Sequence, residues 1–461
     1  MRYAWCSFAA LLASAFVGEG SEFTDLSASF GGAATLMGIY HTTTLNPDLT
    51  SINFWIPSYE GAPARTVSLS NPHMAAADAY GNIYIADKAS HSILKWTPDG
   101  LIHTLAGTHV SGFNGDGPAP ANTLQISYPN GLYVFPDGTL YLLDPGNHRI
   151  RRVDTSGIMT TVVNDPEPRW APSGRALWVS PNQQLIYYTH EFSPVPPSLI
   201  SDGAVVKQWT PSRGIEVVCS RDVGFRNPAN IAVSPIDGKL YVTDRAEEDT
   251  TRVADGLFRI DGPEQRTRLT GNVTQSKASS GQPALSSFIE QPRGIAFLPN
   301  GSYFLCAHKG GDVWFVDTAG ILHRYIQGSG SGDTYLIVDG QHPPLTSKSV
   351  ISQPRSVTLA PNGDLLVVLN DSGYLLRVRN AAPAAEAANL VPAPGASGGL
   401  RLGWDGMFGR GYRIERSSSL VNPSWSPVTA VWGQPAGQTT LLDGLPAGPE
   451  AEGYYRVLPS L

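Results

Sequence analysis

The chain has 461 residues, of which 41% are hydrophobic, and it contains 48 glycines and 37 prolines. This composition fits an all-β protein with many turns and excludes a disordered chain, because enough apolar side chains are present to form a large core. The formal net charge of −7 argues against a general nucleic-acid role, which requires a basic surface.

The first 20 residues have the layout of a secretory signal peptide. Arg2 precedes an apolar run from Ala4 to Val17, and small residues such as Ala15 and Gly18 follow near its end. The run is shorter than the roughly 20 residues of a membrane span, and no other stretch is long and apolar enough. We therefore expect a secreted or periplasmic protein with no membrane span in the mature chain. Residues 21–50 form an N-terminal segment that the sequence leaves open as an extra strand or a plug.

Residues 129–164 predict four short strands joined by turns rich in Pro, Asp, Asn and Gly, which is typical of an antiparallel meander. Residues 72–106 repeat the pattern, at an offset of 57 from Pro72 to Pro129. One meander cannot bury both of its faces, so copies should pack beside one another. Weaker copies begin near Pro172, Pro228, Pro292 and Pro354, and the last of them lacks its fourth strand.

The missing strand is expected to come from upstream of the first copy. Ser51–Ile56, which contains Phe54, is the predicted closing strand, because closure of a ring leaves no bare sheet edge. The predicted fold is all-β, a six-bladed β-propeller over residues 51–380 with N-terminal strand closure.

The repeated motif resembles the NHL repeat. Residues 129–153 match its pattern nearly throughout, including Asn147-His148-Arg149-Ile150, and the loop 111–129 resembles the connection between blades in bacterial NHL proteins. The resemblance covers roughly residues 50–380 and implies a propeller, typically of 4–8 blades. It does not by itself imply an activity.

Two segments follow the predicted propeller. Residues 381–399 are rich in Ala, Pro and Gly and predict a linker. Residues 400–461 contain several strand-like runs and resemble the small β-sandwich modules, similar to fibronectin type III, that end many exported bacterial proteins. Cys219 and Cys306 would lie on different blades, so we expect isolated buried thiols and no bridge.

Candidate binding residues lie at the start of the innermost strands, where all blades converge on the channel mouth. This set of predicted ligand-binding residues consists of His73, Asn130, Arg175, Asn230, Arg293 and Arg355. The arginines suit an anionic group, because a guanidinium pairs well with carboxylate or phosphate. The alternative is structural: these arginines bond to neighbouring carbonyls and close the ring.

Two enzyme interpretations remain open. The segment around Asn130 resembles that of six-bladed gluconolactonase-like hydrolases, whose asparagines help to bind a divalent metal, so Asn130 and Asn230 are weak candidates for a Ca²⁺ site. His73 and Arg293 stand where that family has acids. His73 in Asn-Pro-His-Met also resembles an element of the peptide-amidating lyases, but His148, His308 and His323 do not recur at the inner-strand starts, as a histidine cage would require.

The recurrent aspartates have a structural explanation. Asp87, Asp144 and Asp244 end the second strand of their copies and recur with the turn that follows, and an Asp at such a point normally caps the backbone of that turn rather than forming an acidic ring.

The preferred function is an exported binding or scaffold protein whose partner is a protein, peptide or glycan. Long insertions at 108–128, 191–202, 272–291 and 328–353 would shape its binding face, since loops on a rigid scaffold often carry function. The alternative is a metal-dependent hydrolase or lyase acting at the channel mouth. Convergence of His73, Asn130, Asn230 and a carboxylate on one point would favour the enzyme, and arginines filling that point would not.

Overall fold

The computed structural model describes most of the region from residue 52 to residue 382 and several strands beyond it. The described residues are 23, 31–39, 52–166, 174–191, 204–245, 255–328, 340, 342–345, 351, 353–370, 372–382, 388–394, 400–405, 411–418, 424–432, 440–445 and 454–459. The predicted signal peptide, residues 1–20, and the predicted insertions 191–202 and 328–353 lie wholly or largely outside them. No helix within these ranges has the length and apolar character needed to cross a membrane.

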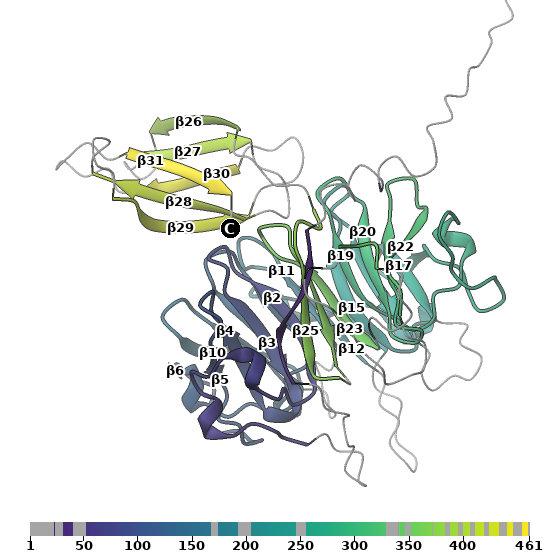
Figure 1. Ribbon diagram of the computed structural model, residues 1–461, viewed down its shortest axis with the longest axis horizontal. Coiled ribbons are helices and arrows are strands. Elements are labelled where there is room, and N and C mark those ends of the chain that lie inside the picture. The colour runs from purple at the N-terminus through teal and green to yellow at the C-terminus, as the bar shows by residue number, and fades with distance from the viewer. Residues whose placement is uncertain are drawn as a thin grey trace, which may run out of the picture.

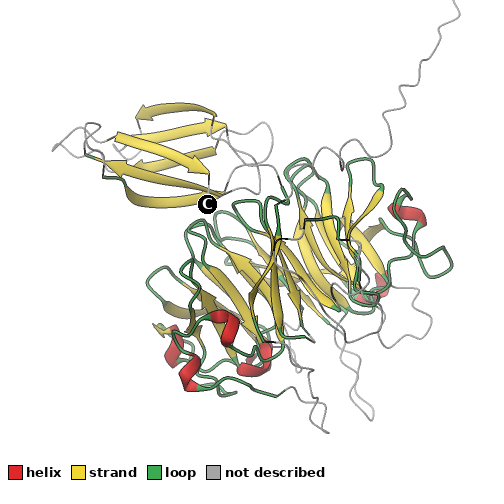
Figure 2. Ribbon diagram, in the orientation of Figure 1, coloured by secondary structure: helices red, strands yellow, loops and turns green. Residues whose placement is uncertain are grey.

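Antiparallel sheets make up nearly all of the regular structure, and the helical segments are single turns on the loops between strands (Figure 2). The first two sheets consist of β2 (Pro72–Ala77), β3 (Ile83–Asp87), β4 (Ser92–Trp96) and β5 (Ile102–Ala106), and of β7 (Leu132–Val134), β8 (Leu140–Asp144), β9 (Arg149–Val153), β10 (Ile158–Asn164) and the short β6 (Ala119–Pro120). The next two consist of β11 (Leu177–Val179), β12 (Ile186–His190), β13 (Val205–Thr210) and β14 (Gly214–Cys219), and of β15 (Pro228–Val233), β16 (Leu240–Asp244), β17 (Gly256–Gly262) and β18 (Gln265–Arg268). Two more consist of β19 (Pro292–Phe297), β20 (Tyr303–Ala307), β21 (Val313–Val316) and β22 (Leu322–Ile326), and of β23 (Pro354–Leu359), β24 (Leu365–Leu369), β25 (Tyr374–Val378) and β1 (Ala33–Met37).

The turns follow from the local sequence. Gly138 adopts a φ of +93°, which glycine reaches without a steric penalty, and its N–H donates to the carbonyl of Phe135 at 2.9 Å. The Asp137 carboxylate accepts the N–H of Thr139 at 2.8 Å, as an Asx turn does. β7 and β8 leave this turn in register, with Leu132 opposite Leu142. Each predicted meander therefore folds back on itself through its own turn residues.

The short 3-10 helices lie on connections between strands. They are η1 (Pro57–Tyr59), η2 (Ala64–Thr66), η3 (Lys88–Ser90), η4 (Ala121–Thr123), η5 (Pro145–Asn147), η6 (Arg221–Val223) and η7 (Ala284–Ser286). Two of them, η3 and η5, directly follow the second strands of their sheets.

The closing strand differs from the prediction. β1 pairs antiparallel with β25, with Ala33 opposite Val378, and Figure 1 shows β1 running alongside β25. The prediction that Ser51–Ile56 fills this place is therefore wrong. Ala33 and Met37 are fully buried in the closing strand, whereas Ile56 is 47% exposed on a loop. The N-terminal segment that the sequence left undecided thus supplies the missing edge.

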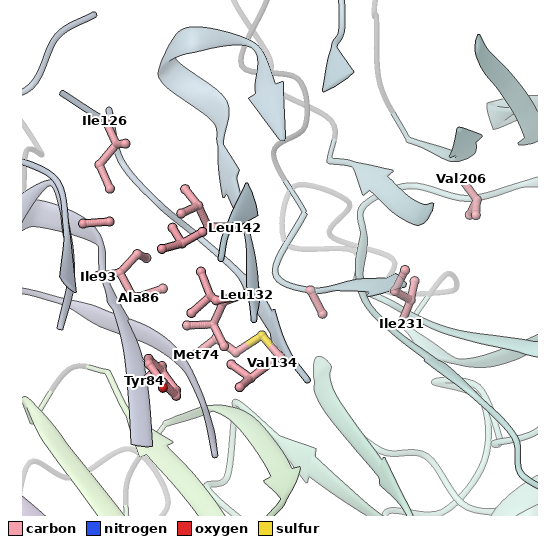
Figure 3. Packing of buried hydrophobic residues seen from close by; sticks show 14 of the residues in the cluster. Met74, Tyr84, Ala86, Ile93, Ile126, Leu132, Val134, Leu142, Val206 and Ile231 are labelled. Atoms are coloured by element: carbon pink, nitrogen blue, oxygen red, sulfur yellow. The ribbon is translucent and has the colours of Figure 1, made fainter. Parts of the chain in front are cut away.

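Apolar side chains fill the spaces between neighbouring sheets. Met74, Leu132 and Val134, from β2 and β7, belong to one buried cluster and are seen together in Figure 3. Cys219 and Cys306 are buried and form no disulfide with each other, as predicted.

The C-terminal region forms two further sheets. They consist of β26 (Ala388–Pro394), β27 (Leu400–Asp405) and β30 (Thr440–Leu445), and of β29 (Ser426–Trp432), β28 (Gly411–Ser417) and β31 (Tyr454–Pro459). Buried Leu402 and Trp404 of one sheet pack with Tyr412 and Ile414 of the other. β26 lies inside the predicted linker 381–399, so the linker prediction is wrong for residues 388–394. Their backbone pairs with β27 despite an Ala/Pro-rich composition, which alone suggested an unstructured link.

Candidate functional site

Aspartates at the ends of second strands fix the loops that lead into the inner strands. Asp87, Asp144 and Asp244 are buried, and each carboxylate accepts a hydrogen bond from a backbone N–H. The donors are Ser70 at 2.9 Å, Ser127 at 2.7 Å and Asn227 at 2.6 Å. The prediction that these aspartates cap the turn after the strand is wrong for Asp87 and Asp144, whose carboxylates make no such cap. The N–H groups that all three accept belong to the preceding loop between sheets. The aspartates thereby set where each inner strand begins.

Arg175 connects several of the predicted mouth residues. Its Nη1 lies 2.7 Å from Nδ1 of His73, and its Nε donates to Oε1 of Glu191 at 3.0 Å. Arg245 donates through Nη2 to Oε2 of Glu191 at 3.1 Å. An arginine can only donate, so Nδ1 of His73 must accept and the ring is neutral. Desolvation, followed by the charge of Arg175, holds the pKa of His73 well below its usual value.

Among the described residues at this position, four charged side chains are basic and one, Glu191, is acidic. Lys88 feels the charges of Arg175, Arg355, Glu191 and Arg245, and we call these five residues the basic layer. Desolvation, and then the repulsion from Arg175 and Arg355, lowers the pKa of Lys88 to about 7. Desolvation alone would raise the pKa of Glu191, but the charges of Arg175 and Arg245 outweigh it, so that pKa lies below its usual value. Clustered guanidinium and ammonium groups of this kind can bind an anion.

Arg355 connects the last sheet to the first. Its Nε donates to Oδ1 of Asn370 at 2.9 Å, and Nδ2 of Asn370 donates to the carbonyl of Pro72 at 2.9 Å. Arg293 is fully buried, and its own carbonyl accepts from the hydroxyl of Thr243 at 3.3 Å. The side chain of Arg175 therefore bonds to Glu191 and His73, and that of Arg355 bonds to Asn370.

The two predicted asparagines have different surroundings. Asn130 is close enough to His73 to influence the pKa of its ring. Asn230 is 2% exposed, and its backbone N–H donates to the Thr243 hydroxyl at 3.0 Å. Its side-chain Nδ2 is buried and has no hydrogen-bond partner among the described residues.

The histidines do not converge as a metal cage would require. His148 ends η5 with a φ of +59°, a turn role, and Nε2 of His323 lies 2.9 Å from Oδ2 of Asp317 on the outer part of its sheet. His308 is buried near the basic layer, where desolvation and then the charge of Arg245 lower its pKa to about 3. Across the described ranges, no three His, Cys, Asp or Glu side chains are placed to hold a metal ion together.

Sequence reasoning missed Lys88, Glu191 and Arg245. Each directly follows the second strand of its sheet, after Asp87, His190 and Asp244 respectively. A pattern that compared the residue after each second strand, instead of the start of each inner strand alone, would have found all three.

An apolar cavity of about 670 Å³ lies along the inner strands, toward their ends. It is lined by parts of β2, β7, β11, β15, β19 and β23, for example Met74, Leu132 and Ile295. Asn230 lines it as well, and so does Trp432 of β29, which also packs against the buried cluster of Phe135 and its neighbours. The C-terminal sheets therefore contribute a side chain to this cavity, and Figure 1 shows them beside one end of the other sheets.

Comparison with known proteins adds the fold family of the repeats. The NHL repeat model matches residues 127–153. Teneurin-m of Drosophila melanogaster is 27% identical over 251 residues, which is 50% of this chain, and the chain spans only 7% of that relative. A protein of unknown function from Bacteroides thetaiotaomicron superposes with a TM-score of 0.52 at 12% identity, covering 76% of this chain and 75% of that one. An auxiliary nutrient binding protein from Bacteroides ovatus gives 0.52 at 13% identity and covers 76% of each chain. These findings support an NHL-type β-propeller.

Proposed function

We propose that the chain is an exported binding protein, and that the channel of its six-bladed NHL-type propeller binds an anionic group of its ligand at the basic layer. The sheets from β2 to β25, with β1 completing the last, support six blades. Two packed three-stranded sheets support a C-terminal module similar to fibronectin type III. The apolar run near Ala4 supports export.

The concentration of positive charge among the described residues carries this proposal. The charges of Arg175, Arg245 and Arg355 all act on Lys88, and Glu191 is the acidic member of the basic layer. Burying like charges together is unfavourable unless a counter-charge compensates them. A carboxylate, sulfate or phosphate group of a ligand would supply that charge and pair with the guanidinium groups.

The metal-dependent hydrolase or lyase is less well supported. A ligand for a metal needs an available lone pair, but Nδ1 of His73 already accepts from Arg175 at 2.7 Å. Arginines at this point would also repel a cation. Calcium-dependent thermal stabilisation of the purified protein separates the two functions: addition of Ca²⁺ or of a chelator should leave the unfolding temperature unchanged if the basic layer binds anions, and a clear rise with Ca²⁺ would favour the enzyme.

Sulfate binding tests the proposal directly. Isothermal titration calorimetry at low ionic strength should detect sulfate binding to the wild type. Arg355→Gln should weaken it about tenfold or more, because a charge-assisted hydrogen bond is lost while the contact to Asn370 can be kept. Arg149→Gln removes the same charge from the partly exposed pair with Asp116 and should change sulfate affinity by less than about twofold. Equal losses in the two variants, or no sulfate binding at all, would refute the proposal.

A further inference from the structure

The channel has two compartments of different chemistry that meet at the same residues. His73, in contact with Arg175, is followed directly by Met74, which lines the apolar cavity. The N–H of Arg175 donates to the carbonyl of Ala229 at 2.7 Å, and the next residue, Asn230, also lines the cavity. Residues that contact the basic layer and residues that line the cavity therefore follow one another along the chain.

The size of the apolar compartment suits a small molecule. Its volume of about 670 Å³ lies within the range of ligand pockets in proteins, roughly 300–1,000 Å³. Along β15 the lining continues from Asn230 to Ser234, a rise of about 13 Å at the spacing of a strand. An extended chain of about eight carbons has a similar length, so the compartment can hold such a chain lengthwise.

Asn230 marks the place where a polar group of the ligand would lie. Its Nδ2 is buried at the boundary of the two compartments, with no hydrogen-bond partner among the described residues. A buried donor without an acceptor is unfavourable, so its presence in a cavity wall points to an acceptor supplied by a ligand. A carboxylate oxygen at this boundary could accept from Asn230 while the basic layer provides the compensating charge.

We propose that the ligand is an amphiphilic carboxylate, with its carboxylate at the boundary near Asn230 and the basic layer, and its apolar chain in the cavity that Trp432 helps to line. This inference rests on the proposed anion-binding function and adds to it the apolar half of the ligand. The ring of Trp432 belongs to the C-terminal module, so the module takes part in enclosing the chain.

The affinities of acetate, octanoate and octanol, measured by calorimetry on the full chain, test this inference. Each buried methylene group should strengthen binding about fourfold, so octanoate should bind at least about a hundredfold more tightly than acetate. Octanol has the chain without the charge and should bind at least about tenfold more weakly than octanoate. Equal affinities of octanoate and acetate would overturn the inference yet leave the anion site intact. Equal affinities of octanol and octanoate would also overturn it.

Variants that fill the cavity provide the second arm. Ala76→Leu adds volume at a partly exposed lining residue of β2 and should reduce octanoate affinity about tenfold, with sulfate affinity changing by less than about twofold. Ala319→Leu makes the same change in an exposed turn and should affect neither ligand. Val233→Phe, another lining position, gives an independent measurement if Ala76→Leu folds poorly. Undiminished octanoate binding in a folded cavity-filling variant would refute the inference. If the wild type itself does not bind sulfate, the premise of the inference, the proposed function, is refuted.

Discussion

Arg149 and Arg151 show how residues of one type, two positions apart, can contribute very differently to stability. Nε of Arg151 donates to Oδ2 of Asp144 at 2.8 Å, and both side chains are fully buried. Nε of Arg149 donates to Oδ1 of Asp116 at 2.6 Å, but the Asp116 side chain is 54% exposed. Water screens the second pair and cannot reach the first, so only the first depends on the protein for all of its charge compensation.

We predict that Arg151→Ala lowers the free energy of unfolding by about 3–5 kcal/mol, because it leaves the Asp144 carboxylate buried without its partner. Arg149→Ala should cost about 1 kcal/mol or less. Denaturant unfolding of the two variants and the wild type measures both values. Similar losses in the two variants would show that Asp144 is compensated by its other hydrogen bonds alone.

His91 provides a second case at the scale of single residues, because its contribution to stability depends on pH. Its Nδ1 accepts the N–H of Tyr128 at 3.2 Å, so the ring binds the next loop only while this nitrogen is unprotonated. Desolvation lowers the pKa of His91 to about 4, below the value near 6.5 of an unfolded chain. The unfolded state therefore binds the proton more readily. The contribution of His91 to stability is complete above pH 6.5 and is lost as the pH falls from about 6.5 toward 4.

As the pH falls from 7 to 5, the free energy of unfolding should decrease by about 1–2 kcal/mol less in His91→Asn than in the wild type. Asparagine suits the left-handed backbone here, where φ is +51°, so the variant should fold. The variant has to be compared with the wild type because other groups also change the stability in this pH range. Desolvation raises the pKa values of Asp87 and Asp244 to about 6 and about 7, so their contribution to stability changes with pH in the opposite direction. Parallel pH profiles for the wild type and His91→Asn would contradict this assignment.

At the scale of elements, the sequence predicted the repeated meanders well, because their turns are encoded locally. The Asp and Gly at each turn specify backbone geometry within three or four residues, as at Asp137 and Gly138. The partners of Asp87, Asp144 and Asp244 were not predicted, because the N–H groups that they accept lie in the preceding loop and not in the local turn. The closing strand could not be read in this way, since its partner β25 lies more than 300 residues away and both candidate segments contain strand-like apolar residues.

The basic layer shows the same limit. His73 and Arg355 were found because each follows the leading proline of its repeat, and Arg175 because it lies near that position in the third repeat. Glu191 and Arg245 come from the ends of second strands, and only the packing of one sheet beside the next brings them to the same point. Comparison of repeat positions therefore identified part of the site. The balance of charges within the site could be seen only in the tertiary structure.

Gly38 offers a test of the closing strand. It follows β1 with a φ of +101°, and a Cβ there would lie 2.1 Å from the carbonyl oxygen of Gly373, just before β25. Gly320 also has a positive φ, +78°, but a Cβ there would meet nothing within 4 Å. Gly38→Ala should therefore destabilise the protein by about 1–3 kcal/mol more than Gly320→Ala, since both share the backbone strain and only the first adds a clash.

Hydrogen exchange locates the effect of this substitution. In Gly38→Ala the amides of Tyr374–Val378 should exchange faster, because β1 is displaced from β25. Gly320→Ala should leave them as protected as in the wild type. Unchanged protection of β25 in Gly38→Ala would mean that β1 does not hold the edge of this sheet.

At the scale of the whole molecule, side chains of the C-terminal sheets contact the other sheets. Among the described residues, Trp432 packs against the cluster of Phe135 and Tyr141, and Arg413 and Glu415 lie close enough to Tyr80 to influence its pKa. Relative motion of two domains is the default unless their interface is large or one anchor residue dominates. The residues of this contact could not be read from the sequence, because an aromatic residue in a half-buried strand looks the same whichever surface it covers.

We predict that Trp432 is this anchor. A tryptophan at the centre of an interface contributes about 2 kcal/mol or more, so Trp432→Ala should shift the equilibrium between docked and undocked modules about 30-fold toward the undocked form. Small-angle scattering should then report a larger radius of gyration. Trp425→Ala removes the same side chain from the same module, where it packs under Arg456 with 4.4 Å between guanidinium and ring, and should leave the radius unchanged. An equal radius for Trp432→Ala and the wild type would show that other contacts hold the module, and the cavity would then be enclosed without depending on this residue.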